Sequence, residues 1–262
     1  MWIGAQISSM ELLTIRSFIA MGHEFHLWLY DSPPITPVDG LRLRDASEVI
    51  SREFVFSYRN KNTFGHGQGS YAGFSDIFRY KLLHEYGGWW VDMDVTCLRP
   101  FDFEQPYVFR SHHELQVVGN VMKCPRGSAL MKAAYEEAVN SVDAENTDWH
   151  KPIEILNRHI SALDLTEYIR ADLSYPDDWR IISKFIKGNA SCDQKYYFIH
   201  WLNEEWRARH LSKNVYRYRS LLGSLMAQQK ISAEGISRRA YFFNYIQTST
   251  FFENLRLLNV IE

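Results

Sequence analysis

Two aspartates separated by one residue, Asp92 and Asp94, are the side chains of this sequence best placed for metal chemistry. They follow a short apolar run at residues 89–91, which predicts a buried strand. Because side chains alternate along a strand, both carboxylates are expected on one face, about 7 Å apart, with Trp89, Val91 and Met93 packed on the other. Like charges on one face need compensation, and a divalent cation is the simplest source. The spacing therefore predicts a site for such a cation.

The segment before this strand is expected to be a helix that begins at Ser75 or Asp76 and continues to about Tyr86. A Gly87-Gly88 pair then ends the helix and turns the chain directly into the aspartate strand. The helix therefore leads straight into the predicted cation site.

One face of the predicted helix carries polar side chains. Asp76, Arg79, Tyr80 and Leu83 are spaced at i, i+3, i+4 and i+7 and so share that face. An Asp–Arg pair three residues apart is usually a surface ion pair, and an Asp-x-Asp sequence is frequent by chance. Their joint placement within one short segment is what indicates a functional site.

The remaining pattern predicts an α/β fold with a mostly parallel sheet flanked by helices. Near the start of the chain, Trp2-Ile3-Gly4 suggests a first strand, Ser9 caps a helix to about Met21, and a strand covers residues 25–30. A surface loop is expected at 57–73. Further strands are expected at 107–110, 116–122 and 197–200, helices at 128–140 and 152–159, and helical structure from about residue 215.

Composition places the chain among globular proteins. Its 262 residues are 46% hydrophobic and 15% aromatic, which is enough for a packed core. A formal net charge of −2 offers no electrostatic reason to expect nucleic-acid binding. The three cysteines are widely spaced and match no zinc pattern, so reduced thiols in a cytoplasmic protein are expected. No apolar run approaches the ~18 residues that span a bilayer.

The region 75–94 carries a long pattern made of Ser75, Asp76, Arg79, Tyr80, Leu83, Gly87, Gly88, Trp89, Trp90, Asp92 and Asp94. This pattern resembles the sugar-binding DxD region of GT-A glycosyltransferases of the family 32 type. That group includes initiating mannosyltransferases, α1,4-galactosyltransferases and bacterial capsule and lipopolysaccharide enzymes. The resemblance implies a single GT-A domain over 1–262, with a donor-binding part at 1–125. The acceptor side and a C-terminal helical addition then occupy 126–262.

The resemblance also implies roles for individual residues. Asp92, Asp94 and Arg79 would act in catalysis, and Mn²⁺ or Mg²⁺ would be held by Asp94, with Asp92 and His200 as further candidate ligands. His200 belongs to a segment similar to an H-x-x-N-x-x-W element of the wider group. The implied donor-binding residues are Trp2, Ile3, Ser75, Asp76, Arg79, Tyr80, Asp92, Asn120, Asn203 and Trp206.

Ordinary structural roles compete with several of these assignments. Trp2 is equally compatible with a buried N-terminal residue, Asn120 with a turn residue, and His200 with a hydrogen-bonded residue after a strand. One departure from the resemblance concerns the acceptor side, where relatives often have Gly-Pro and this chain has Lys151-Pro152. The acceptor side therefore stays open.

The activity implied by the resemblance is retaining transfer of a hexose from a nucleotide diphosphate sugar. UDP-hexose is the first choice of donor and GDP-mannose the second, and the acceptor would be a glycan or lipid-linked glycan of a bacterial surface polysaccharide. A front-face mechanism needs no enzymic general base. At most peripheral contact with the inner face of the membrane is expected, through the basic and aromatic tail that contains Arg217, Arg219, Arg238 and Arg239.

Two other functions fit part of the pattern. Asp92-Met93-Asp94-Val95-Thr96 matches the D-x-D-x-T motif of haloacid dehalogenase-type phosphatases, in which the first aspartate attacks phosphorus. That chemistry also needs a lysine and an acidic pair, for which Asp177-Asp178 is the candidate doublet. The second alternative is an inactive carbohydrate-binding relative that uses the eight tryptophans as stacking platforms.

Overall fold

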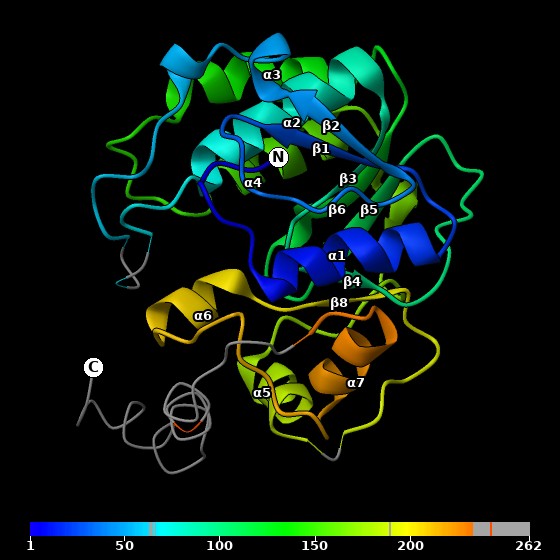
Figure 1. Cartoon of the computed structure of the whole chain (residues 1–262). Helices are drawn as coiled ribbons and strands as arrows, with labels where there is room; N and C mark the ends of the chain where they lie inside the picture. Colours follow the sequence, from blue (N-terminus) through cyan, green and yellow to red (C-terminus); the bar gives the residue numbers. More distant parts are fainter. Residues whose placement is uncertain (63–64, 66, 189, 233–241, 243–262) are drawn as a thin grey trace.

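The structure is a computed structural model with a mixed α/β architecture, and it describes residues 1–232 and 242 except 63–64, 66 and 189. Figure 1 shows α2, α3 and α4 gathered at one end and α5, α6 and α7 at the other. In chain order the elements are α1 (Ser9–Ala20), β1 (Phe25–Leu29), β2 (Leu41–Asp45), η1 (Ala46–Glu48), η2 (Arg52–Phe54), α2 (Ala72–Tyr86), β3 (Gly88–Val91), β4 (Val95–Cys97), β5 (Val108–His112), β6 (Gln116–Cys124), α3 (Ala129–Ser141), α4 (Lys151–Ala162), η3 (Thr166–Tyr168), β7 (Ile169–Arg170), α5 (Trp179–Lys187), β8 (Phe198–His200), α6 (Asn203–Ala208) and α7 (Leu221–Gln228).

The strands form one four-stranded sheet in the order β3-β6-β5-β7 and two small sheets, β1-β2 and β4-β8, within the described residues. The pairs β1–β2 and β5–β7 are parallel, whereas β3–β6, β5–β6 and β4–β8 are antiparallel. The prediction of a mostly parallel sheet is therefore wrong for these strands. A short connection is one physical reason, because the three residues 113–115 between β5 and β6 allow only a hairpin.

The N-terminal helix α1 begins one residue earlier than predicted, because its N-cap is Ser8 rather than Ser9. The Ser8 hydroxyl accepts a hydrogen bond from Met10 N, and the Glu11 carboxylate accepts one from Ser8 N, so the two ends of a capping box are present. The strand at 25–30 is confirmed as β1. The expected first strand at Trp2 is reduced to a single parallel bridge to Leu29.

The helix α2 begins at Ala72, three or four residues before the predicted start at Ser75 or Asp76, and ends at Tyr86 as predicted. Gly87 has φ 68°, a left-handed conformation that favours glycine, and a Cβ added there would lie 2.4 Å from Arg126 N. Both observations explain why glycine terminates this helix. The abrupt end of α2 then directs the chain into β3.

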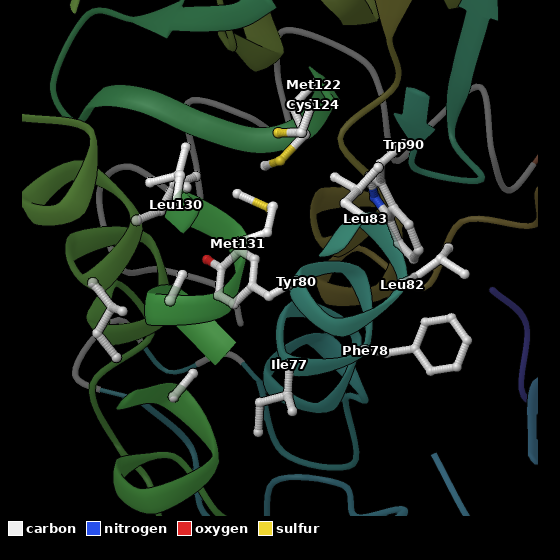
Figure 2. Packing of buried hydrophobic residues seen from close by; sticks show 14 of the residues in the cluster. Ile77, Phe78, Tyr80, Leu82, Leu83, Trp90, Met122, Cys124, Leu130 and Met131 are labelled. Atoms are coloured by element: carbon white, nitrogen blue, oxygen red, sulfur yellow. The ribbon is translucent and has the colours of Figure 1, made fainter. Parts of the chain in front are cut away.

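A hydrophobic core joins α2 to α3 and to the four-stranded sheet. Figure 2 shows Tyr80 and Met131 between the two helices, with Trp90 beside Leu83 and Met122 next to Cys124 above them. These side chains are nearly inaccessible to solvent. Burial of this apolar surface is the main stabilising contribution to the packing that holds α2 in place.

The second half of the chain contains elements that the sequence pattern did not predict, namely α5 and α6. The helix α5 follows the N-cap Asp178, and Trp179, Ile182 and Phe185 are buried on one face. They share a core with α1 and α7. Within the C-terminal region for which helical structure was predicted, the structure describes the short helix α7, whereas Arg238, Arg239 and most of the tail after them lie outside the described residues.

No helix among the described residues has both the length and the apolar character needed to cross a membrane.

Candidate functional site

A cavity of about 760 Å³ lies at the end of β3 and collects residues from both halves of the chain. Its lining includes most of the side chains that the sequence singled out. They are Trp2, Ile3, Ser75, Asp76, Arg79, Asp92, Asp94, Asn120, His200 and Asn203. The cavity therefore brings the predicted site residues together.

Asp92 and Asp94 lie in the turn between β3 and β4 and not in a strand, which corrects the prediction of simple alternation. Trp89, Val91 and Met93 do share one hydrophobic cluster, as the alternating pattern predicted. The two carboxylates have different neighbours because the chain turns between them, yet both line the same cavity.

The Asp92 carboxylate is held by two donors from its own half of the site. Its Oδ1 accepts hydrogen bonds from Arg79 Nη2 at 3.0 Å and from Trp90 Nε1 at 2.7 Å. Burial raises the pKa of Asp92, and the positive charge of Arg79 only partly offsets this effect. The ring of Trp90 also lies under the guanidinium, 5.1 Å from it.

Arg79 serves two carboxylates at once. Its Nη1 lies 2.9 Å from Asp76 Oδ1, and both side chains are buried, which excludes an ordinary surface ion pair. Burial raises the pKa of Asp76 to about 6, while Arg79 acts in the opposite direction. A Cβ at Gly119 would lie 2.3 Å from Arg79 Nη1, so glycine in β6 makes room for the guanidinium.

Asn120 is the strongest sign of a ligand on the β6 side of the cavity. Its side chain is buried, and neither Oδ1 nor Nδ2 has a hydrogen-bond partner among the described residues. Its backbone oxygen accepts a hydrogen bond from Asp92 N at 2.8 Å, which ties β6 to the aspartate turn. A buried amide without partners is costly, and a polar ligand in the cavity would satisfy it.

Asp94 is held by partners that are remote in sequence. Its Oδ2 accepts a hydrogen bond from Asn203 N at 2.7 Å and lies 3.2 Å from His200 Nε2. Burial acts to raise the pKa of Asp94, but His200 and the Asn203 N–H outweigh it, and the net pKa is lowered. Asp94 is therefore the more firmly ionised of the two acids.

His200 lies between two carboxylates, because its Nδ1 is 2.9 Å from Asp177 Oδ1. Asp177 in turn accepts two hydrogen bonds from Arg110, at 2.8 and 2.6 Å. Burial acts to lower the pKa of His200, but Asp177 and Asp94 raise it to about 10. Burial likewise opposes ionisation of Asp177, yet His200 and Arg110 hold its pKa far below the usual range.

Two predicted donor-binding residues do not line the cavity. Tyr80 is fully buried in the core, where its hydroxyl donates to Pro152 O. Trp206 is also buried, with its Nε1 donating to Trp201 O. The helical repeat and the H-x-x-N-x-x-W spacing placed them near the site, but the core needs both rings for packing.

The aspartate pair leaves two carboxylate oxygens for a ligand. Asp92 Oδ2 and Asp94 Oδ1 accept no hydrogen bond from a described residue, and both acids face the cavity. No group of three or more His, Cys, Asp or Glu side chains within the described ranges is arranged to hold a metal alone. The donor set fits a hard divalent cation whose other ligands come from a diphosphate and water.

The predicted metal-ligand role of His200 stays a prediction. In the present arrangement each ring nitrogen lies within 3.2 Å of a carboxylate oxygen, so neither is free for a metal.

Several residues of the site were missed by sequence reasoning. Arg110 and Asp177 lie behind His200, and Lys213 lines the cavity and pairs with the buried Glu11. The Lys213 ammonium also donates to Asn203 Oδ1 at 3.0 Å. The sequence signal for Asp177 is the acidic doublet at 177–178, which fits the phosphatase alternative.

Comparisons with known proteins give two findings. Residues 50–115 match the family model described as "Capsular polysaccharide synthesis protein". That segment contains α2, the double glycine and both cavity aspartates. The chain is also similar to a solved structure titled "PaToxG Glycosyltransferase", with a TM-score of 0.44 and 12% sequence identity over 95% of this chain and 84% of the other. A search of curated protein sequences finds no match.

Proposed function

We propose that this protein is a metal-dependent glycosyltransferase that moves a hexose from a nucleotide diphosphate sugar to a glycan acceptor. The observation that carries the proposal is the single cavity that holds the Asp92 and Asp94 carboxylates together with the unpartnered amide of Asn120. The match of residues 50–115 to capsular polysaccharide synthesis proteins supports it, because that segment supplies the aspartate half of the cavity.

In this proposal Asp92 and Asp94 would hold Mn²⁺ or Mg²⁺ through the oxygens that accept no hydrogen bond from a described residue. When bound, the cation supplies positive charge that stabilises the departing nucleoside diphosphate. Arg79 fixes the direction of Asp92 and carries a buried positive charge at the cavity wall. Lys213 adds a second cation beside Asn203.

The sugar would be recognised by groups on α2 and β6. The amide of Asn120 offers its Nδ2 as a donor group and its Oδ1 as an acceptor to sugar hydroxyls, and Asp76 offers carboxylate oxygens on the same cavity. The nucleotide would extend towards Trp2, which lies on the same cavity. UDP-hexose is the proposed first donor and GDP-mannose the second, and transfer would retain the anomeric configuration.

The acceptor is proposed to be a glycan or lipid-linked glycan of a surface polysaccharide, and the enzyme would act in the cytoplasm, at most peripherally on the membrane. The acceptor side of the site is proposed to lie within residues 126–262. In this part of the chain, α4 and α6 contribute Ile153, Glu205 and Arg207 to the cavity wall.

A donor panel tests the proposal directly. Purified protein is mixed with UDP-hexoses and GDP-mannose, with and without Mn²⁺, and thermal unfolding and donor hydrolysis are measured. A preferred donor should raise the melting temperature only with metal, since ligands that bind the native state stabilise it. No stabilisation and no hydrolysis with any donor would refute the proposal.

The same preparation decides between the transferase and the phosphatase alternative. Turnover of a generic aryl phosphate without any nucleotide-sugar hydrolysis would favour the phosphatase. The structure separates the acidic doublet on which that alternative depends, because Asp177 lines the cavity whereas Asp178 caps α5 and pairs with Arg180.

A further inference from the structure

We infer that Asp177 is a positioning residue for the proposed reaction: together with Arg110 it holds the His200 ring so that Nε2 faces Asp94. The inference rests on the proposed function and assigns a role to two residues outside the DxD region. Asp177 precedes α5, Arg110 lies in β5 and His200 ends β8, so three elements meet at this point.

Arg110 is the anchor of the arrangement. Its side chain is buried, and Nε donates to Ser174 Oγ at 2.7 Å while Nη2 donates to Tyr175 O at 3.0 Å. The same guanidinium donates hydrogen bonds to both carboxylate oxygens of Asp177. A fork of this kind fixes both the position and the plane of the carboxylate.

Asp177 transmits that fixed geometry to His200. The direction of one imidazole nitrogen is set by the hydrogen bond that the other nitrogen makes. Since Nδ1 is directed at Asp177, Nε2 is directed at Asp94 Oδ2, 3.2 Å away. Together with Asn203 N, His200 occupies Oδ2 and leaves Oδ1 of Asp94 for a ligand.

Asp177 also lies at the cavity wall beside a second histidine. His112 Nε2 is 3.8 Å from Asp177 Oδ2, and His112 Nδ1 accepts hydrogen bonds from Glu114 N and Leu115 N, both at 3.2 Å. These bonds fix the His112 tautomer with its proton on Nε2, towards Asp177. The loop 113–115 is thereby connected to the same carboxylate.

A double-mutant cycle tests whether Asp177 acts through His200. The affinity of UDP in the presence of Mn²⁺ is measured by calorimetry for wild type, Asp177→Asn, His200→Gln and the double variant. Loss of such a supporting carboxylate is expected to weaken binding about 10–100-fold. In the His200→Gln background the same change should have little further effect. Additive losses would overturn the inference.

Asp178→Asn is the matched control. It removes the same charge one residue away, outside the cavity, and asparagine caps the helix as well as aspartate does. This variant should bind UDP with Mn²⁺ as wild type does. Weakening equal to that of Asp177→Asn would attribute the effect to net charge and would also overturn the inference.

A spectroscopic measurement on the wild-type protein keeps the test independent of whether Asp177→Asn folds. Nitrogen-15 NMR of the imidazole rings, assigned with His200→Gln, should show a proton on Nδ1 of His200, directed at Asp177. A ring with no proton on Nδ1 would overturn the inference. If wild type binds no nucleotide with Mn²⁺ although this proton is present, the proposed function fails while the geometry of His200 stands.

Discussion

Asp92 and Asp94 line the same cavity but sit in regions that are built differently. Asp92 depends on Arg79 and Trp90, both within 13 residues of it in sequence, and it shares that arginine with Asp76. Asp94 depends on His200 and Asn203, more than 100 residues away. The Asp92 region is therefore assembled from one helix and the turn that follows β3. The Asp94 region forms only when the second half of the chain packs against that turn.

This difference in construction has an electrostatic consequence. In the Asp92 region the single charge of Arg79 is shared between the buried Asp76 and the partly exposed Asp92, so desolvation prevails and the pKa of Asp92 is raised. In the Asp94 region His200 and a backbone N–H serve one oxygen, and the pKa of Asp94 is lowered. Neighbouring acids thus differ in how readily they carry the charge that a cation needs.

The largest expected effect comes from neutralising the aspartates. Asp94→Asn should lower donor turnover, measured as kcat/KM, by about 10³-fold, which corresponds to roughly 4 kcal/mol of lost charge stabilisation. Asp92→Asn should lower it less, because Asp92 is the less firmly ionised acid. A greater loss at Asp92 would reverse the proposed ranking of the two regions.

Removing Arg79 should strongly destabilise the Asp92 region. Arg79→Met leaves the buried Asp76 and the partly exposed Asp92 without a cation, and the free energy of unfolding in urea should fall by about 3–5 kcal/mol. Arg59→Met is the control, since Arg59 pairs with Glu145 on the exposed surface and should contribute at most about 1 kcal/mol. Equal effects would contradict the assignment of a buried network.

The Asp94 region should give the protein a distinctive dependence of stability on pH. The pKa of His200 is raised to about 10, so the folded state holds the proton more tightly than the unfolded chain does. This contribution is fully present below the unfolded value of about 6.5 and is lost as the pH rises towards 10.

Urea unfolding with a chelator at several pH values measures this dependence. The free energy of unfolding of wild type should fall by a few kcal/mol between about pH 6.5 and pH 10. The His200→Gln variant should be less stable at the lower pH and should lose less stability as the pH rises. Parallel profiles for the two proteins would show that the His200 ion pairs do not stabilise the fold.

The smallest expected effect concerns the turn that leads into the Asp92 region. Gly87→Ala places a side chain at φ 68° and 2.4 Å from Arg126 N, and should destabilise by about 2 kcal/mol or more. Gly88→Ala has a similar φ of 87° but no atom within 4 Å, so about 1–2 kcal/mol is expected. Identical losses in thermal unfolding would show that the close approach of residue 126 is unimportant.

Local signals were sufficient for the Asp92 region. The helix, its glycine stop and the following strand could be predicted because each depends on neighbours a few residues away. Even there, the start of α2 and the strand alternation at Asp92 and Asp94 were misplaced, since a turn begins where the pattern continued. Whether a side chain on one face of a helix, such as Tyr80 on α2, lines a cavity or fills the core is decided by the elements that pack against that face.

The sequence alone determined that a helix, a double glycine and a short strand lead directly to a pair of acids. Helical and strand periodicity and the conformational freedom of glycine are properties of short segments, so this part could be predicted locally. Only the tertiary structure decided that Arg110, Asp177 and His200 converge on Asp94. Their separation along the chain carries no periodic signal, and their contact exists only once β5, β8 and the start of α5 are packed together. The antiparallel pairing of the strands was likewise a product of that packing and of short connections.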